Sequence, residues 1–338
     1  MIRPRTLRNL RRELRSSALA KVGIVLIVAV VLVAVFAPVF APQNPFDQNL
    51  DNKQQPPLGF SRTETQVGQE IVDGEIQFIN ETTTVNATLA HPLGTDALGR
   101  DMLSRVLYGA RTSLLVGVLG TAIAAVLGVT VGLSAGYYGG KVDDALMRSA
   151  DVMLAFPSLV LAVALVGLFG GATVSVPDPI VALGFAPGMP DSFALPGTVI
   201  LVVALVNWVW FARVARGEAL SITDAEYVKA ARSVGASDGF ILRRHVLPNS
   251  ITPILVLATI QIAAIILLES SLSYLGFSGA NLSWGFDIAQ GRDYLATAWW
   301  ISTMPGIAIV LTVIGVNLVG DWLRDALDPG IEGEGGGA

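Results

Sequence analysis

The sequence predicts an all-α polytopic membrane protein with six transmembrane helices, and three observations support this fold class. Hydrophobic residues make up 52% of the 338-residue chain and charged residues only 14%, whereas a soluble globular domain carries about 25% charged residues. Mean hydropathy is +0.61. Six apolar runs without charged residues each have roughly the 17–25 residues that a helix needs to cross a bilayer core; they span 22–41, 113–135, 152–176, 195–212, 251–268 and 299–320.

The first span, 22–41, follows an arginine-rich arm, as the apolar core of a signal peptide would. Its apolar run exceeds the roughly 7–15 residues of such a core, and proline follows both Ala37 and Ala41, so we expect a retained anchor. Six spans place both termini on one side. Of the 22 Lys and Arg residues, 16 fall on that side and 6 on the other. This bias predicts a plasma-membrane protein with both termini in the cytoplasm.

A long polar segment, 43–97, precedes the second span and has too little apolar content for a large core. The apolar residues that follow recur at helical spacing, with charges on the opposite face, which predicts an amphipathic helix in the membrane interface or against the bundle. Its apolar positions are Leu98, Met102, Leu103, Val106 and Leu107, and the basic residues before the span are Arg100, Arg105 and Arg111.

Glycines recur every four residues along the second span and share one helix face: Gly128, Gly132, Gly136 and Gly140. Small residues let helix backbones approach closely in lipid. We favour a packing face within this chain and keep a dimer face as the alternative. Pro157 and Pro305, near the starts of the third and sixth spans, are positions where helices kink.

Glu269 is the one acidic residue that borders the fifth span. An ionisable group at membrane depth is a functional candidate, here a contact in a translocation pathway. Local pairing near the outer interface is the favoured alternative. The sequence has no chain of buried acids of the kind that relays protons, which disfavours an ion-coupled carrier.

The loop 213–250 contains two predicted short helices. Thr223 and Glu226 form a capping box that starts a helix over 224–234, and Gly235 ends it. A second helix covers 239–246 and ends before Pro248. Together they make an elbow suited to receive force from a cytoplasmic partner. A DNA-binding helix-turn-helix is disfavoured because the loop lacks a third helix, so no nucleic-acid partner is expected.

This elbow resembles the EAA loop of ABC importer permeases, whose pattern is E-A-A, three residues, G, nine residues, I, one residue, L-P. The spacing is intact, but Lys229 replaces the Glu and His245 replaces the Ile. The resemblance implies that the loop couples to the ATPases. The residues concerned are Glu226, Tyr227, Lys229, Ala230, Ala231, Gly235, Arg244, His245, Leu247 and Pro248.

Three further regions resemble the C-type subunit of dipeptide, oligopeptide and nickel importers: 91–101 with 108–111, 136–140 with 155–157, and 317–329. The resemblance covers about 10–329, except an insertion at about 61–90. It implies a MetI-like type-1 ABC permease core preceded by one extra span. The expected divisions are an arm with the first span (1–60), an insertion with the pre-core segment (61–108), the core (109–322) and a cytoplasmic tail (323–338).

The resemblance also implies the partners: a second homologous permease subunit, two cytoplasmic ABC ATPases, an extracytoplasmic substrate-binding protein, and membrane lipid. The expected substrates are peptides or a small solute such as nickel. The chain has no P-loop, since 136–141 lacks the spacing and the following Ser or Thr. We therefore expect a permease that is not an enzyme and holds no cofactor, with ATP and Mg bound by the partner ATPases.

Two other functions are weaker. A secondary, ion-coupled transporter would need buried acids or broken helices at mid-membrane, and it has no use for the elbow. A membrane enzyme would need a reactive constellation, but the chain has no cysteine and only two histidines, His91 and His245. The same composition leaves no expected metal site.

Overall fold

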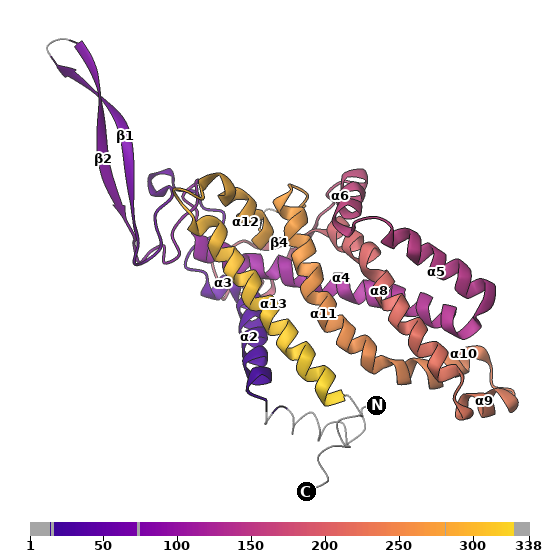
Figure 1. Cartoon of the computed structure of the whole chain (residues 1–338). Helices are drawn as coiled ribbons and strands as arrows, with labels where there is room; N and C mark the ends of the chain where they lie inside the picture. Colours follow the sequence, from indigo (N-terminus) through magenta and orange to yellow (C-terminus); the bar gives the residue numbers. More distant parts are fainter. Residues whose placement is uncertain (1–13, 15–16, 73–74, 281, 328–338) are drawn as a thin grey trace, which may run out of the picture.

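The computed structural model describes residues 14, 17–72, 75–280 and 282–327 and shows a bundle of long helices (Figure 1). In this part of the chain, five helices are long and apolar enough to cross a membrane: α2 (Ala18–Val35), α4 (Met102–Tyr138), α8 (Gly197–Thr223), α11 (Leu247–Tyr274) and α13 (Trp300–Leu327). Most of the arginine-rich arm and the tail after 327 lie outside the described residues.

Two short structures mark opposite ends of the bundle (Figure 1). An antiparallel hairpin of β1 (Ser61–Val72) and β2 (Glu75–Asn86) projects from one end, called the hairpin end below. Helices α9 (Glu226–Ser233) and α10 (Asp238–Ile241) lie at the other, called the elbow end. The hairpin falls within the segment expected to be an insertion, where no strands were predicted. Its Thr and Val residues favour β structure.

Short elements connect the long helices. A second antiparallel hairpin joins β3 (Val174–Pro177) to β4 (Ser192–Leu195), also without a predicted counterpart. The others are α3 (Ala37–Phe40), a 3₁₀ turn (Leu50–Asn52), α7 (Pro179–Ala182), a π turn (Leu242–Val246), α12 (Trp284–Gly291) and a 3₁₀ turn (Arg292–Tyr294). The fold is therefore mostly helical, as predicted, with hairpins added at its connections.

The third predicted span is not one straight helix, and the kink expected at Pro157 is confirmed. The region instead forms α5 (Gly140–Leu154) and α6 (Ser158–Phe169), which are bent by 91° at their junction. Pro157 lies at the bend. Proline interrupts a helix because it has no backbone N–H to donate and because it disfavours helical backbone angles at the residue before it. Helix α6 has 12 residues and is about 18 Å long, too short for a hydrocarbon core of about 30 Å. A sixth crossing exists only if the bent pair counts as one span. Pro305 lies inside α13, which continues through it.

Helices α4 and α8 pack closely through glycine. A Cβ atom on Gly128, Gly132 or Gly136 would overlap a carbonyl oxygen of α8. The three oxygens belong to residues four apart, Trp208, Ala212 and Arg216, so the glycine period matches one face of α8. The stripe therefore packs within this chain. Gly140 does not belong to it: α4 ends at Tyr138, and Gly140 begins α5 with φ +51°.

A helix does cover Met102–Leu107 and lies against the bundle, as one of the two predicted placements had it, but it is not separate from the second span. Helix α4 begins at Met102, where the Asp101 carboxylate accepts from the Ser104 amide at 2.7 Å, and it continues without a break to Tyr138. The predicted boundary at 108 thus falls inside one helix. The basic side chains are not on a solvated face, since Arg105 and Arg111 are buried.

Buried ion pairs explain how these arginines are accommodated. The Arg105 guanidinium donates to Asp287 of α12 at 2.8 Å, Arg111 pairs with Asp178 before α7, and Arg100 donates to Asp96 at 2.6 Å. Burial raises the pKa of the Asp287 carboxyl, and the Arg105 guanidinium opposes part of that rise. The Arg105 and Arg111 pairs connect α4 to α12 and to the segment before α7, both far away in sequence, whereas the Arg100 pair is local.

A candidate coupling elbow

The first elbow helix does not start as predicted. Helix α8 continues through Thr223, whose hydroxyl donates to the Leu220 carbonyl at 3.1 Å. Because this hydroxyl is used inside α8, it cannot cap the next helix, and α9 begins at Glu226 without a side-chain cap. The Glu226 side chain is 96% exposed and lies 4.0 Å from the Lys229 ammonium. The capping box is therefore absent.

The end of α9 follows the prediction. Gly235 has φ +83°, which confirms that the turn needs the left-handed region. The Ala236 amide donates to the Ala231 carbonyl at 3.1 Å, and the Gly235 amide donates to the Arg232 carbonyl at 3.0 Å. These two bonds define a Schellman motif. Gly235 thus fixes the direction in which the chain leaves α9.

The second elbow helix does not end at Pro248. Helix α10 passes through the π turn Leu242–Val246 directly into α11, and Pro248 lies in the first turn of α11. The Leu247 amide bonds the Leu242 carbonyl in the wide ring of a π turn. Proline breaks the ordinary ladder by lacking an N–H and clashing with the carbonyl four residues earlier, and a π turn relieves that conflict. The elbow is therefore continuous with a long helix.

Apolar side chains anchor the elbow to the bundle. Val228, Ile241 and Val246 are fully buried, one from each elbow segment. They belong to one core cluster with residues of α4, α8 and α11, including Leu133, Tyr137, Phe211, Ala215, Ala219, Ile222 and Ile254. Any displacement of the elbow must therefore change its apolar contacts with all three long helices.

Tyr137 supplies a polar link at the same place. Its hydroxyl donates to the Asp238 carboxylate at 2.6 Å, at the start of α10. The Arg232 guanidinium of α9 lies 5.3 Å from the centre of the Tyr137 ring, a cation–π contact. The last turn of α4 thus holds both elbow helices.

The opposite face of the elbow is exposed and partly aromatic. The rings of Tyr227 and Phe240 each lie 5.8 Å from the His245 ring, and Tyr227 and Phe240 are 47% and 52% exposed. Val234 is 85% exposed. The two exposed rings gathered beside His245 are typical of a docking surface. Sequence reasoning missed Phe240 and Val234, although two large apolar residues in a polar loop were a usable signal.

The other predicted elbow residues fall in the same region. Lys229, Ala230, Arg244, Leu247 and Pro248 are exposed, and Ala231 is half-buried. The structure therefore brings the predicted set together on one protruding surface.

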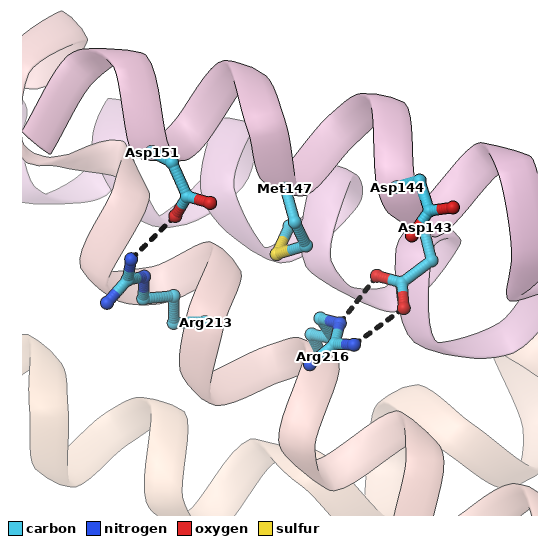
Figure 2. Close-up of a pocket in the computed structure, with 6 residues that line it drawn as sticks. All are labelled: Asp143, Asp144, Met147, Asp151, Arg213 and Arg216. Atoms are coloured by element: carbon cyan, nitrogen blue, oxygen red, sulfur yellow. Dashed lines mark hydrogen bonds and ion pairs between the residues drawn. The ribbon is translucent and has the colours of Figure 1, made fainter.

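Helix α5 lies against α8 close to the elbow end, through two ion pairs (Figure 2). Arg216 donates two bonds to Asp143, at 2.5 and 2.6 Å, and Arg213 donates to Asp151 at 2.8 Å. Asp144 and Met147 complete the lining of an open groove of about 400 Å³. The Arg213 pair is exposed and contributes little stability, whereas the two-pronged Arg216 pair fixes the position of α5.

Glu269 is fully buried in α11 and surrounded by hydroxyls. Its carboxylate accepts bonds from Ser273 at 2.8 Å, Ser113 of α4 at 3.2 Å and Ser270 at 3.4 Å. Ser283, which caps α12, donates to Ser273 at 3.3 Å. The geometry favours local pairing over a pathway contact because the side chain has no exposed surface. Glu269 ties α4, α11 and α12 together.

Comparisons with known proteins agree with this architecture. Residues 128–333 match the family of binding-protein-dependent transport system inner membrane components, and residues 6–57 match the N-terminal transmembrane domain of oligopeptide transport permease C.

Relatives match most of the chain. The dipeptide transport system permease protein DppC of Alkalihalophilus pseudofirmus is 33% identical, over 94% of this chain and 88% of its own. A putative peptide transport system permease of Brucella suis is 37% identical, over 93% and 89%. The glutathione transport system permease GsiD of Pectobacterium atrosepticum is 38% identical, over 76% and 78%.

A solved structure shares the fold. An inward-facing MetNI methionine ABC transporter chain aligns with a TM-score of 0.51 at 18% identity, covering 67% of this chain and 98% of that one. Such a likeness supports the fold and nothing finer.

Proposed function

Because the chain belongs to the family of binding-protein-dependent transport inner membrane components, we propose that it forms half of a pathway through which peptides enter the cell. It is a multi-pass permease subunit of an ABC importer. Its relatives are named as permeases for dipeptides, peptides and glutathione, and these names support a peptide substrate. Nickel or another small solute is the second candidate within the same subfamily.

The elbow is the observation that carries this proposal. Its rim, with Tyr227 and Phe240 exposed beside the half-buried His245, offers a contact for a cytoplasmic ATPase. Its buried side packs against α4, α8 and α11. ATPase closure would press on this rim, and the continuous rod from α10 into α11 would pass the displacement into the bundle. Transport then follows if the bundle has two states whose balance the ATPases shift.

The proposed assembly has four further subunits. A second homologous permease pairs with this chain, two ATPases bind the two elbows, and a substrate-binding protein delivers the peptide. We propose that ATP and Mg are bound by the partner ATPases and not by this chain, because its sequence lacks a P-loop. An ion-coupled transporter is not favoured, since the family depends on a binding protein.

We assign the elbow end to the cytoplasm and the hairpin end to the outside, with both termini cytoplasmic. The excess of Lys and Arg on the elbow side supports this orientation. The cysteine-free chain permits a clean test with single cysteines at Lys229 and at Thr84, which is exposed on β2. A membrane-impermeant maleimide should label Thr84→Cys in intact cells and Lys229→Cys only after lysis. Labelling of Lys229→Cys in intact cells would invert the orientation.

The function itself is tested by uptake into vesicles that contain all five proteins. We expect dipeptide accumulation that requires ATP inside the cytoplasmic compartment and the binding protein outside. Omission of this chain should abolish it. Accumulation driven by a proton or sodium gradient without ATP would contradict the proposal.

A further inference from the structure

The break between α5 and α6 leaves irregular backbone exposed. Ala155, Phe156 and Pro157 separate the two helices, and all three are exposed in this chain. Phe156 is 53% exposed. Helix α6 starts after Pro157 without a side-chain cap, so the side chains of this chain do not satisfy all the backbone polar groups at the break. The coupling mechanism uses none of these residues.

The contacts of α5 and α6 with α8 place the break near the middle of the membrane. The apolar cluster that contains α6 extends along α8 from Val199 to Val206, and the cluster that contains the end of α5 begins at Trp208. The break therefore lies beside Asn207. From Gly197, where α8 starts, to Asn207 the helix rises about 15 Å, which is half of a hydrocarbon core of about 30 Å.

Charged groups next to the break show what covers it. Irregular backbone at this depth does not face lipid, because hydrocarbon offers no hydrogen-bond partners; it occurs only inside protein or along a water-filled cavity. Asp151 pairs with Arg213 one helical turn before Ala155, and the two side chains are 64% and 48% exposed. Exposed charges are costly in lipid and in a dry protein interface. Water therefore reaches this face of α5.

The groove shown in Figure 2 extends the hydrated face toward the elbow end. Its α5 wall consists of Asp143, Met147 and Asp151 with Asp144 beside them, and a spacing of four residues places the first three in one row along the helix. Ala155 is the next position in that row and keeps helical backbone angles, φ −67° and ψ −21°. The groove and the break thus form one continuous face from the elbow end to the middle of the membrane.

We propose that this face, from Asp143 to Phe156, is a wall of the peptide pathway, and that Phe156 contacts the apolar side chains of a passing peptide. The inference rests on the proposed peptide transport and names the part of the chain that the peptide meets. A half-exposed aromatic ring beside a hydrated groove is stabilised when another apolar group covers it. An apolar side chain of the peptide does so while the charged ends of the peptide stay hydrated in the groove.

A single cysteine at Phe156 tests whether water reaches the break, since the chain has no native cysteine. The complete transporter is placed in vesicles with the elbow side outward, and a charged methanethiosulfonate is added outside. Phe156→Cys should react roughly tenfold faster than Val126→Cys, because a thiol that faces lipid neither ionises nor meets a charged reagent. Val126 is the control because it is apolar and exposed within the unbroken helix α4. Equally slow reaction at both positions would place the break against lipid or the second permease subunit and overturn the inference.

The same vesicles test the contact with the peptide. With the binding protein and dileucine enclosed and ATP outside, the reaction of Phe156→Cys should slow, whereas enclosed diglycine should leave its rate unchanged. Equal rates with the two dipeptides would remove the peptide contact from the proposal.

Uptake by ring variants separates a peptide contact from a structural role. Phe156→Ala should raise the dileucine concentration for half-maximal uptake about threefold to tenfold and leave that for diglycine unchanged, and Phe156→Leu should restore most of the loss. Phe169→Ala, at the far, exposed end of α6, should change neither value. An unchanged dileucine value in Phe156→Ala, or an equal rise for both dipeptides, would overturn the contact. Absence of ATP-driven uptake by the unaltered complex would instead refute the proposed function.

Discussion

At the elbow end, apolar side chains seat two short helices on the bundle and leave an aromatic rim exposed, whereas at the hairpin end buried ionic and hydroxyl groups join segments far apart. Val228, Ile241 and Val246 represent the first arrangement, and the Arg105–Asp287 pair represents the second. Apolar contacts are non-directional. A buried ion pair, in contrast, is favourable only when the distance and orientation of its two charged groups are nearly ideal. The comparison indicates an elbow that can transmit movement and a hairpin end that holds its shape.

The largest expected effect is at the hairpin end. Arg105→Ala leaves the Asp287 carboxylate buried without its partner, which should cost about 3–5 kcal/mol of stability. We expect low membrane abundance and a lower thermal unfolding temperature for the purified complex. Arg213→Ala, which breaks the exposed pair with Asp151, should cost less than about 1 kcal/mol. Equal losses in the two variants would remove the distinction between the ends.

An intermediate effect is expected at Glu269. Glu269→Ala leaves the hydroxyls of Ser113, Ser270 and Ser273 without an acceptor, which should cost roughly 1–3 kcal/mol. Glu269→Gln keeps an acceptor oxygen and should lose less. Thermal unfolding of both variants measures this difference.

Uptake by the same two variants distinguishes pairing from a pathway contact. Because Glu269 has no exposed surface, the relative uptake of different dipeptides should stay the same in Glu269→Gln. A change in that preference would favour the pathway interpretation.

The smallest effects are expected within α9, where two positions differ in burial. Val228→Ala removes buried apolar surface and should cost about 1–2 kcal/mol. Glu226→Ala, on the exposed side without a capping box, should change stability by less than about 0.5 kcal/mol. Chemical unfolding of the complex compares them. A larger loss in Glu226→Ala would mean that its carboxylate has a structural role.

The two ends also differ in how far the sequence predicted them. Gly235 was predictable because the Schellman turn depends on a few neighbouring residues. The long spans were predictable because an apolar run of sufficient length has few alternatives in a membrane. The glycine stripe followed from spacing alone, except that the joint between α4 and α5 excluded Gly140.

Long-range pairing was not predictable from one sequence. Arg105 and Asp287 are 182 positions apart, and an arginine before a span looks the same whether it faces water or an acid. Pro157 marked the place of the bend, but its 91° angle was not predictable, because a proline indicates where a helix is interrupted and not how far the chain turns there. The π turn before Pro248 was hidden because proline usually signals an end.

The central claim is that the elbow couples ATP hydrolysis to transport, and Gly235→Asp tests it most directly. At φ +83° a side chain costs about 1 kcal/mol or more, and no atom lies within 4 Å of an added Cβ, so the bundle should still assemble. Gly235→Ala serves as the control for backbone strain without charge.

The measurement is peptide uptake and ATP hydrolysis in the same vesicles, beside membrane abundance. We predict that Gly235→Asp reaches near-normal abundance while uptake falls sharply, with the ATPases either lost or hydrolysing ATP without transport, and that Gly235→Ala is milder. Normal uptake by Gly235→Asp at normal abundance would contradict the account and place the coupling contact elsewhere.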